Sequence, residues 1–512
     1  MTFPEFDRLT LLRGSGRAAA SAGYLYRPTQ VEQIAVLFEQ AARGGWTVAP
    51  RGAGRSYGDA ALNGGQVVLD LQRMNRVLDW NPDTGVIRAE PGVTIEQIWQ
   101  CCLEDGWWPP VVPGTMRPTL GGCLGMNIHG KNNYRAGPFG EHVLAFEALL
   151  PTGELVRCTP HSDPNLFYGL ISGAGLLGVF TSITLQLHAI HSGDVTVTAW
   201  TAPSMRAMLD SMEPLKSTAD YLVGWVDTTA GGGGLGRGQV HSAQYVPAQD
   251  EAARAQSLSR DHQKLPDKLL GLVPMSALWP FMPLGFNSLM MPLVNTGKYL
   301  AGRLEKHHYR QSLVAFNFLL DSLPIVDYAY GRRGLIQYQS FVPRAAAADT
   351  FRAILDLTQR RGMPSFTGVT KRHRPDPFLF SHAVDGFSMA LDFPVPRRAE
   401  ALDQMAHDLD RLVLDAGGRF YFAKDSTLTP YAAARYLGEA TLARFRALKT
   451  RCDPQDVLQT DLYRRVLAPA VALAASGAPL TPGDSLRLPE RELVPAGAGA
   501  PIIAGNGNGR HG

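Results

Sequence analysis

Residues 51–65 read RGAGRSYGDAALNGG, and residues 109–140 read PPVVPGTMRPTLGGCLGMNIHGKNNYRAGPFG. In the first stretch, glycines alternate with small residues, so successive backbone N–H groups are left open. Such a nest of amides binds the anionic oxygens of a phosphate without a lysine. The second stretch could then hold the rest of a large planar cofactor and its polyol chain. Charged and aromatic residues stand between the glycines in both stretches, which favours a binding site over plain surface loops.

The segments around these stretches predict a mixed fold. A helical apolar period ending in a glycine pair, followed by a short strand, covers residues 24–50. Residues 142–160 have the pattern of a hairpin with Thr-Gly at the turn. From residue 191 onward, alternating strands are separated by helices at 345–361 and 398–416, which indicates an antiparallel sheet. We therefore expect an α+β fold.

Gly173-Ala-Gly175-Leu-Leu-Gly178 satisfies the GxGxxG pattern of dinucleotide-binding folds. That pattern works when the glycines follow a strand and open a helix, whose N-terminus then holds the pyrophosphate. Here a helix-like stretch precedes the glycines and the β-rich VFTSITLQL follows them. The order is reversed, so we expect a tight turn rather than a nicotinamide site.

The composition is that of an ordinary globular protein. Of 512 residues, 45% are hydrophobic and 19% are charged, and the net charge is +3. The basic residues are scattered, which gives no reason to expect nucleic-acid binding. The five cysteines show no CxxC and no metal-ligand spacing with histidine, so we expect neither a disulfide framework nor a metal site. The 53 glycines are the unusual feature.

The two ends and one internal stretch bear on location. The N-terminus lacks the apolar core of a signal peptide, so we expect a cytoplasmic protein. Residues 269–297 contain no Asp, Glu, Lys or Arg, but four prolines interrupt any membrane-spanning helix there. Two interpretations stay open: an apolar flap that meets a lipid tail or a membrane face, and short helices packed in a domain. From residue 467 to 512 the chain is rich in Ala, Gly and Pro, and we expect a disordered tail.

Several motifs together resemble flavin-dependent oxidoreductases with a PCMH-type (vanillyl-alcohol-oxidase-like) FAD domain. In chain order they are RGAGRSYGDAALNGG, the PGT and IHGKN block, GLISGAGLLGV, YGRRGLIQYQ, LDFP and FAKDS. The resemblance runs from about residue 24 to 466. It implies a two-part FAD domain made of residues 10–190 and a returning segment 417–466. A substrate domain with an antiparallel sheet, residues 191–416, would cover the flavin.

The resemblance also implies cofactor-binding residues. They are Arg51, Gly52, Ala53, Gly54, Arg55, Ser56, Tyr57, Pro113, Gly114, Thr115, Thr119, Gly121, Gly122, Asn127, His129, Gly173, Gly178, Val179 and Tyr421. In related aldonolactone oxidases a histidine in the first loop binds the flavin covalently. This sequence has Arg55 at that place, so we expect non-covalent FAD.

Oxidising an alcohol requires hydride transfer to the flavin and a group that accepts the hydroxyl proton. Lys424 in FAKDS is the first candidate for that base, since desolvation lowers the pKa of a lysine. His129 could relay a proton, and Lys131 could meet a phosphate. The resemblance assigns further contacts to the sugar or its phosphate, namely Tyr330, Gln337, Gln339, Lys371 and Ser388. Without the motifs, each of these would be read as a core or surface residue.

Two positions depart from related sequences, which carry asparagine at Ser388 and cysteine at Ala390. The resemblance implies oxidation of a secondary hydroxyl of a lipid-linked or phosphorylated pentose, with an NAD(P)H-dependent reductase partner completing an epimerisation. Such a protein could contact the inner face of the membrane through residues 269–297. Two alternatives stay open, an aldonolactone oxidase or dehydrogenase and a non-catalytic flavin-binding subunit.

Overall fold

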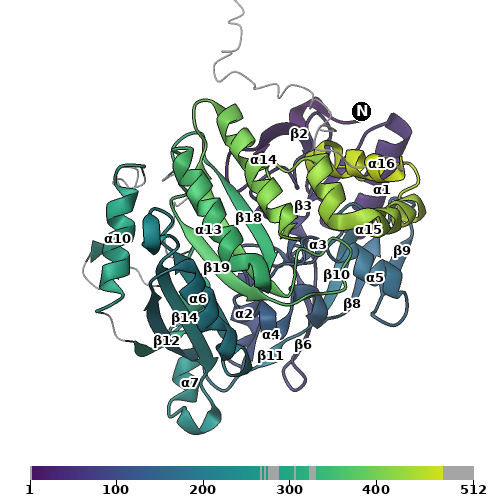
Figure 1. Cartoon of the computed structure of the whole chain (residues 1–512). Coiled ribbons are helices and arrows are strands. Elements are labelled where there is room, and N and C mark those ends of the chain that lie inside the picture. Colours follow the sequence, from purple (N-terminus) through teal and green to yellow (C-terminus); the bar gives the residue numbers. More distant parts are fainter. Residues whose placement is uncertain are drawn as a thin grey trace, which may run out of the picture.

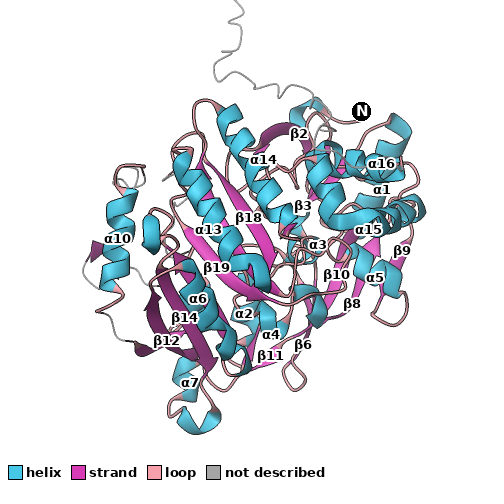
Figure 2. Cartoon of the chain, in the orientation of Figure 1, coloured by secondary structure: helices cyan, strands magenta, loops and turns pink. Residues whose placement is uncertain are grey.

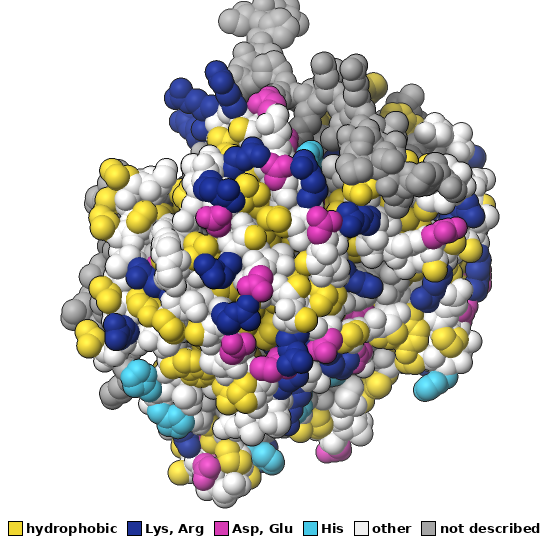
Figure 3. Space-filling model, in the orientation of Figure 1, with side chains coloured by type: hydrophobic (Ala, Val, Ile, Leu, Met, Phe, Trp, Pro, Cys, Tyr) yellow, Lys and Arg dark blue, Asp and Glu magenta, His cyan; other side chains and the backbone are white. Residues whose placement is uncertain are grey.

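The computed structural model describes residues 3–265, 268–269, 273–274, 287–304, 307–321 and 330–476 (Figure 1). The main sheets of the described residues have four, five and eight strands, and helices pack around them (Figure 2). Long helices lie over the largest sheet, with basic and acidic side chains interspersed on that face (Figure 3).

The N-terminal sheet has the strand order β1-β2-β4-β3. Its strands are β1 (Leu9–Arg13), β2 (Ala20–Tyr26), β3 (Val48–Arg51) and β4 (Val67–Asp70). β4 pairs in parallel with both β2 and β3. Helix α1 (Val31–Gly44) connects β2 to β3 and buries one face, made by Ile34, Leu37, Phe38 and Ala41. The helix ends at the glycine pair, as expected, and Gly45 adopts the left-handed conformation there.

The second sheet is antiparallel, with the order β5-β6-β10-β8-β9. Its strands are β5 (Val77–Asn81), β6 (Val86–Ala89), β8 (Val143–Leu149), β9 (Leu155–Cys158) and β10 (Val179–Gln186). β8 and β9 form the hairpin expected from the Thr-Gly turn. Helices between these strands are α2 (Ile95–Cys102), α3 (Leu120–Gly125), α4 (Asn133–Ala136) and α5 (Pro164–Leu170). α2 starts with a capping box of Thr94 and Gln97.

The GxGxxG segment is a turn, as its sequence context indicated. It follows helix α5 and leads into strand β10. Ser172, Ala174 and Gly175 all have positive φ angles there, between 53° and 74°. Strands β7 (Trp107–Trp108) and β11 (His188–Ala189) form a separate two-stranded antiparallel sheet, and β11 follows β10 in the chain.

The third sheet has eight antiparallel strands, in the order β17-β12-β14-β13-β19-β20-β18-β21. They are β12 (Asp194–Ala202), β13 (Tyr221–Val226), β14 (Gly238–Tyr245), β17 (His308–Ser312), β18 (Leu335–Pro343), β19 (Gly368–His373), β20 (Gly386–Pro394) and β21 (Arg419–Phe420). One face is covered by α6 (Met205–Met212), α13 (Arg344–Arg360) and α14 (Ala399–Asp415), as Figure 1 shows. This confirms the expected antiparallel sheet and the two expected helices. Shorter elements around it are α7 (Arg254–Ser257), β15 (Lys268–Leu269), β16 (Val273–Pro274), α10 (Met291–Ala301) and α11 (Leu313–Asn317).

The C-terminal part returns to the first sheet. Helix α15 (Pro430–Cys452) leads to a segment in which Val457 and Gln459 exchange backbone hydrogen bonds with Val48 of β3. A π-helical turn (Tyr463–Leu467) and helix α16 (Ala468–Ala475) follow. The expectation that disorder starts at residue 467 is wrong for this part, because Ala470 is buried and α16 packs against α15. Residues 477–512 of the expected tail lie outside the described residues.

The apolar stretch 269–297 lies largely outside the described residues. Its last part belongs to α10, which stands at the edge of the molecule (Figure 1). Within the described ranges, no helix combines the length and the apolar character needed to cross a bilayer.

Candidate active site

Strands β18, β19 and β20 turn a row of polar side chains away from the covering helices. In the antiparallel ladder, Ser388 lies opposite Lys371 on one side, and Gln339 lies opposite Ala390. Residues paired in this way share one face of a sheet. The other face belongs to the helices, because Tyr338 donates a 3.0 Å hydrogen bond to Asp410 of α14. The sheet therefore brings together Gln339, Lys371 and Ser388, three of the residues that the resemblance implied as substrate contacts.

His129, from the second glycine stretch, meets this polar face. The Gln339 Nε2 atom lies 3.2 Å from His129 Nε2 and 3.4 Å from Ser388 Oγ. The His129 ring also contacts those of His373, His382 and Tyr421, with centroid separations of 5.0, 5.2 and 5.4 Å. Burial and the neighbouring positive charges, that of Lys371 first, hold the pKa of His129 well below its usual range. His129 is therefore an uncharged imidazole in a tightly packed site.

Three lysines stand around this cluster with lowered pKa values. Burial is the main cause for each, and it brings the pKa of Lys424 to about 7, that of Lys131 to about 7 and that of Lys371 to about 8. The charge of Lys371 lowers the other two further. Lys131 donates to the carbonyl of Phe316. Within the described ranges neither Lys371 nor Lys424 forms a salt bridge, although the charge of Asp392 acts to raise the pKa of Lys424.

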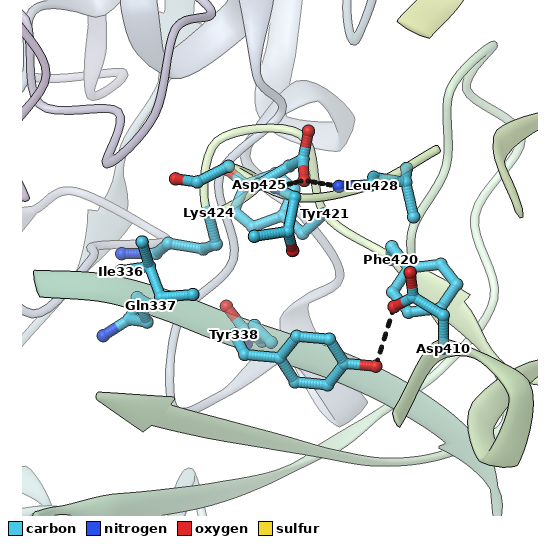
Figure 4. Close-up of a pocket in the computed structure, with 12 residues that line it drawn as sticks. Ile336, Gln337, Tyr338, Asp410, Phe420, Tyr421, Lys424, Asp425 and Leu428 are labelled. Atoms are coloured by element: carbon cyan, nitrogen blue, oxygen red, sulfur yellow. Dashed lines mark hydrogen bonds between the residues drawn. The ribbon is translucent and has the colours of Figure 1, made fainter. Parts of the chain in front are cut away.

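The first glycine stretch passes directly beside Lys424. Tyr57 donates its backbone N–H to the Ala423 carbonyl at 2.8 Å, and Lys424 Nζ lies 4.0 Å from the centre of the Tyr57 ring. Arg465 joins the same two loops, since its guanidinium binds Asp59 at 2.7 Å and Asp425 at 2.7 Å. A small pocket opens between β18 and residues 420–428. Figure 4 shows Lys424 and Gln337 on one side of this pocket and the Tyr338–Asp410 hydrogen bond on the other.

The glycine stretches form a backbone cradle that fits a phosphate-bearing cofactor. Within the described ranges, Ala53, Gly54 and Arg55 donate no backbone hydrogen bond, and the buried Arg55 Nε atom has no partner. A Cβ atom on Gly52 would come 2.1 Å from Thr119 Oγ1, so the two stretches touch through a glycine. Arg51 supports the loop from behind, by donating to the carbonyls of Ala61 and Arg13. Open amides beside an orphaned guanidinium nitrogen are suited to phosphate oxygens.

The second stretch is anchored from two sides. Thr115 donates its hydroxyl to Asp321 at 2.8 Å, and the next amide, that of Met116, donates to the same carboxylate. Asn127 accepts from the Gly140 amide, and its Nδ2 atom is buried without a partner in the described residues. Gly121 donates to the Pro91 carbonyl, and Thr119 caps α3 by accepting from Gly122. These residues hold the stretch in one conformation, while the Asn127 amide is left for a ligand.

Three further predicted cofactor residues, Gly173, Gly178 and Val179, belong to the turn before β10 and to the start of that strand. A Cβ atom on Gly178 would meet Leu150 and Leu170, and Val179 is buried in β10, so this end of the turn faces the apolar interior. A Cβ atom on Gly173 would meet the Gly169 carbonyl of α5. Gly175 instead packs against Pro50 at the start of the cradle. Gly175 is thus the glycine of this turn that contacts the start of the cradle, whereas Gly173 and Gly178 pack against other parts of the chain.

Tyr330 joins a separate apolar group with Tyr57, Met291, Leu335 and Phe366. Its ring stacks on Phe366 at 5.7 Å, and burial raises its pKa well above the usual range. Gln337 donates a 2.6 Å hydrogen bond to Asp392, whose charge acts to raise the pKa of Lys424. Tyr330 therefore reaches the site through its contact with Tyr57.

Several residues that complete the site were not predicted from sequence. His373 and His382 pack around His129, Asp321 anchors the second glycine stretch, and Arg465 joins the two loops beside Lys424. None of them lies in a glycine-rich motif. Only strand alternation, which puts His373 two residues from Lys371 and so on the same face, gave a signal that could have found one of them.

Comparison with known proteins agrees with this geometry. Residues 22–159 match the FAD binding domain family. The chain is 31% identical to decaprenylphosphoryl-beta-D-ribose oxidase of Mycolicibacterium smegmatis, over 91% of this chain and 99% of that protein. It is 32% identical to an uncharacterized protein of Streptomyces coelicolor, over 73% of this chain and all of that protein. Cytokinin dehydrogenase 6 of Oryza sativa is 32% identical over 35% of this chain and 37% of its own.

The FAD binding match covers the two glycine stretches, whose cradle fits the cofactor, and decaprenylphosphoryl-beta-D-ribose oxidase matches along nearly its full length. The polar face and the lowered lysine pKa values supply groups suited to alcohol oxidation. The chain is therefore an FAD-dependent oxidoreductase and belongs to the PCMH-type family that includes decaprenylphosphoryl-beta-D-ribose oxidase.

Proposed function

We propose that this enzyme oxidises a secondary hydroxyl of a lipid-linked or phosphorylated pentose to a ketone, as the oxidising half of a 2'-epimerisation. The observation that carries the proposal is a pair of lysines at a buried polar face, Lys371 and Lys424, neither of which forms a salt bridge with a carboxylate within the described residues. A phosphate on the substrate would supply the missing negative charge. The Mycolicibacterium smegmatis relative, which matches along 99% of its length, is named for decaprenylphosphoryl-beta-D-ribose.

Lys424 accepts the hydroxyl proton in this scheme. A pKa of about 7 leaves a large share of its amine neutral at physiological pH, which a base requires. When bound, FAD supplies the hydride acceptor. The hydride leaves the carbon that bears the hydroxyl, the proton goes to Lys424, and the alcohol becomes a ketone. His129 lies beside the reacting groups and hydrogen-bonds the substrate.

The other predicted contacts position the sugar. Lys371 pairs with the phosphate, and Gln339 and Ser388 hydrogen-bond the ring hydroxyls from the same strand face. Lys131 and Gln337 border this group, and Tyr330 closes the side next to Tyr57. Because all three strands β18, β19 and β20 contribute, the substrate lies across them rather than along one.

The test is an anaerobic mixing experiment with decaprenylphosphoryl-β-D-ribose and, in parallel, D-arabinono-1,4-lactone. We expect the flavin absorbance near about 450 nm to fall with the phosphorylated pentose and to persist with the lactone. Bleaching by the lactone alone would assign the enzyme to aldonolactone oxidation. Persistence with both, together with unchanged behaviour of Lys424→Ala, would indicate a non-catalytic flavoprotein.

We propose that FAD is bound without a covalent link. Arg55 stands in the cradle where related lactone oxidases carry the linking histidine, and His129 is engaged by Gln339. Acid precipitation of the holoenzyme checks this directly. The yellow colour is expected in the supernatant, and flavin that stays with the pellet would contradict it.

A lipid-bearing substrate requires access to a membrane, and α10 with the turn before it offers an apolar surface. Leu289 is 81% exposed and Leu293 is 65% exposed next to it. We propose peripheral contact at the inner face of the membrane through residues 269–297. We also propose that an NAD(P)H-dependent reductase takes the ketone. Vesicle flotation of Leu289→Ser/Leu293→Ser, against Val36→Ser on α1 as control, tests the contact. Equal flotation of both variants would refute it.

A further inference from the structure

A continuous line of hydrogen bonds crosses the polar face from Asn133 to His129. Asn133 Oδ1 lies 3.0 Å from His373 Nδ1, and His373 Nε2 lies 2.8 Å from Ser388 Oγ. Ser388 Oγ lies 3.4 Å from Gln339 Nε2, which is 3.2 Å from His129 Nε2. Four elements contribute to this line, namely α4, β19, β20 and β18, together with the loop that carries His129. It is therefore a product of the tertiary fold.

The backbone N–H of Arg374 can only donate, and this fixes which atom is the donor in each hydrogen bond of the line. The backbone N–H of Arg374 points at Asn133 Oδ1, at 3.4 Å. That contact requires the oxygen, and not the amide nitrogen, of Asn133 at this position. An oxygen can only accept, so the hydrogen of His373 must be on Nδ1.

The protonation of His373 in turn fixes the donor in its hydrogen bond with Ser388. His373 is completely buried, and burial together with the charges of His382, Lys371 and Arg372 holds its pKa well below the usual range. A neutral ring with hydrogen on Nδ1 has a lone pair on Nε2, which accepts the Ser388 hydroxyl. The Ser388 oxygen is then left to accept from the amide of Gln339.

The line ends at His129. Gln339 Nε2 carries two hydrogens, one for Ser388 and one for His129 Nε2. A nitrogen that accepts cannot carry the ring hydrogen, so the neutral His129 ring carries it on Nδ1. That Nδ1 atom is buried and has no partner among the described residues. A buried donor without a partner is costly unless a ligand satisfies it.

We propose that His373, acting through Ser388 and Gln339, holds His129 as the Nδ1–H tautomer, so that His129 donates a hydrogen bond to an oxygen of the bound substrate and does not accept its proton. His373 is thus a positioning residue, and Lys424 is left as the base. The chemistry rests on the proposed function, whereas the tautomer does not.

The direct test is a long-range ¹H–¹⁵N spectrum of the flavin-loaded protein labelled at histidine, with His129→Gln used to assign the His129 signals. The wild type is expected to show one neutral tautomer with hydrogen on Nδ1. In Ser388→Ala the Gln339 amide loses one partner and can rotate, so a mixture of tautomers is expected. Ser388→Thr keeps the hydroxyl and restores the single tautomer. His373→Phe is expected to behave like Ser388→Ala.

The matched control is His382→Phe. This ring also packs on His129, at 5.2 Å, but takes no part in the line of hydrogen bonds. It is expected to leave the tautomer unchanged. An Nε2–H or doubly protonated His129 in the wild type, or an unchanged tautomer in Ser388→Ala, overturns the proposal.

Kinetics separate this proposal from the proposed function. With the phosphorylated pentose as substrate, Ser388→Ala should lower kcat about tenfold, and Ser388→Thr should recover it. Tenfold is the scale expected when the hydrogen bond from His129 to a substrate oxygen that gains negative charge is lost. If no sugar is oxidised, the proposed function fails while the spectrum still reports the tautomer. If the sugar is oxidised but Ser388→Ala keeps the wild-type kcat, the donor role is overturned alone.

Discussion

Lys424 lies over the ring of Tyr57, with its ammonium nitrogen 4.0 Å from the ring centre. The two residues come from loops that are far apart in the chain, and the hydrogen bond from Tyr57 N–H to the Ala423 carbonyl fixes their approach. An aromatic face stabilises a cation but offers no proton acceptor. The lysine therefore remains free to exchange its proton with a bound alcohol.

Lys424→Met should remove the base and leave the fold intact. We expect kcat to fall by about 10²- to 10⁴-fold, the usual contribution of a general base, while the flavin content stays that of the wild type. Stopped-flow measurement of flavin bleaching gives the rate. Lys264→Met, on an exposed surface lysine, serves as control and should keep full activity. Wild-type rates in Lys424→Met would exclude a base role.

The pH dependence follows from the lowered pKa of Lys424, about 7. The base must be neutral, so kcat/KM should rise as the pH passes through about 7, and it should fall again above about 8, where Lys371 loses the charge that pairs with the phosphate. The charge of Lys371 is one cause of the lowering. Lys371→Met should therefore move the rise to higher pH and also raise KM for a phosphorylated sugar. A profile that stays in place would show that the two amines do not interact.

Arg465 ties the first glycine stretch to the Lys424 loop through Asp59 and Asp425. Arg465→Met would leave these carboxylates in a largely buried position without their cation. We expect a loss of about 3–5 kcal/mol in the free energy of unfolding, together with weaker flavin retention. Arg360→Met removes an exposed ion pair with Asp356 and should cost less than about 0.5 kcal/mol. Urea titration of both variants decides between these outcomes.

Gly52→Ala should disturb the cradle, because the new Cβ atom would lie 2.1 Å from Thr119 Oγ1. A displacement of this kind typically costs about 1–3 kcal/mol, and we expect a lower ratio of flavin to protein absorbance. Thr119→Ala removes the clashing oxygen, so the double variant should recover part of the flavin. Gly233→Ala, where a Cβ atom would meet nothing within 4 Å, is the control. Full flavin content in Gly52→Ala would contradict this account of the cradle.

Local pattern predicted much of the fold and the centre of the site. The apolar period of α1, the Thr-Gly hairpin and the alternation of β18 and β20 each reflect an interaction between near neighbours in sequence. The two glycine stretches, with Lys424 and His129, were found because the motifs are contiguous. The disordered tail was misplaced at its start, because composition does not reveal that an Ala-rich helix packs against α15.

The sequence by itself determined the class of protein, because glycine spacing fixes where a backbone can cradle a phosphate and period fixes which face of an element is apolar. Only the tertiary structure decided how the groups cooperate. Arg465 and Asp59 are 406 positions apart, and His129 meets Gln339 across 210. The lowered pKa of Lys424 and the direction of the hydrogen bonds through His373 arise from burial and from neighbours brought by the third sheet. Such properties belong to the packed chain, since no single segment contains both partners of any of these contacts.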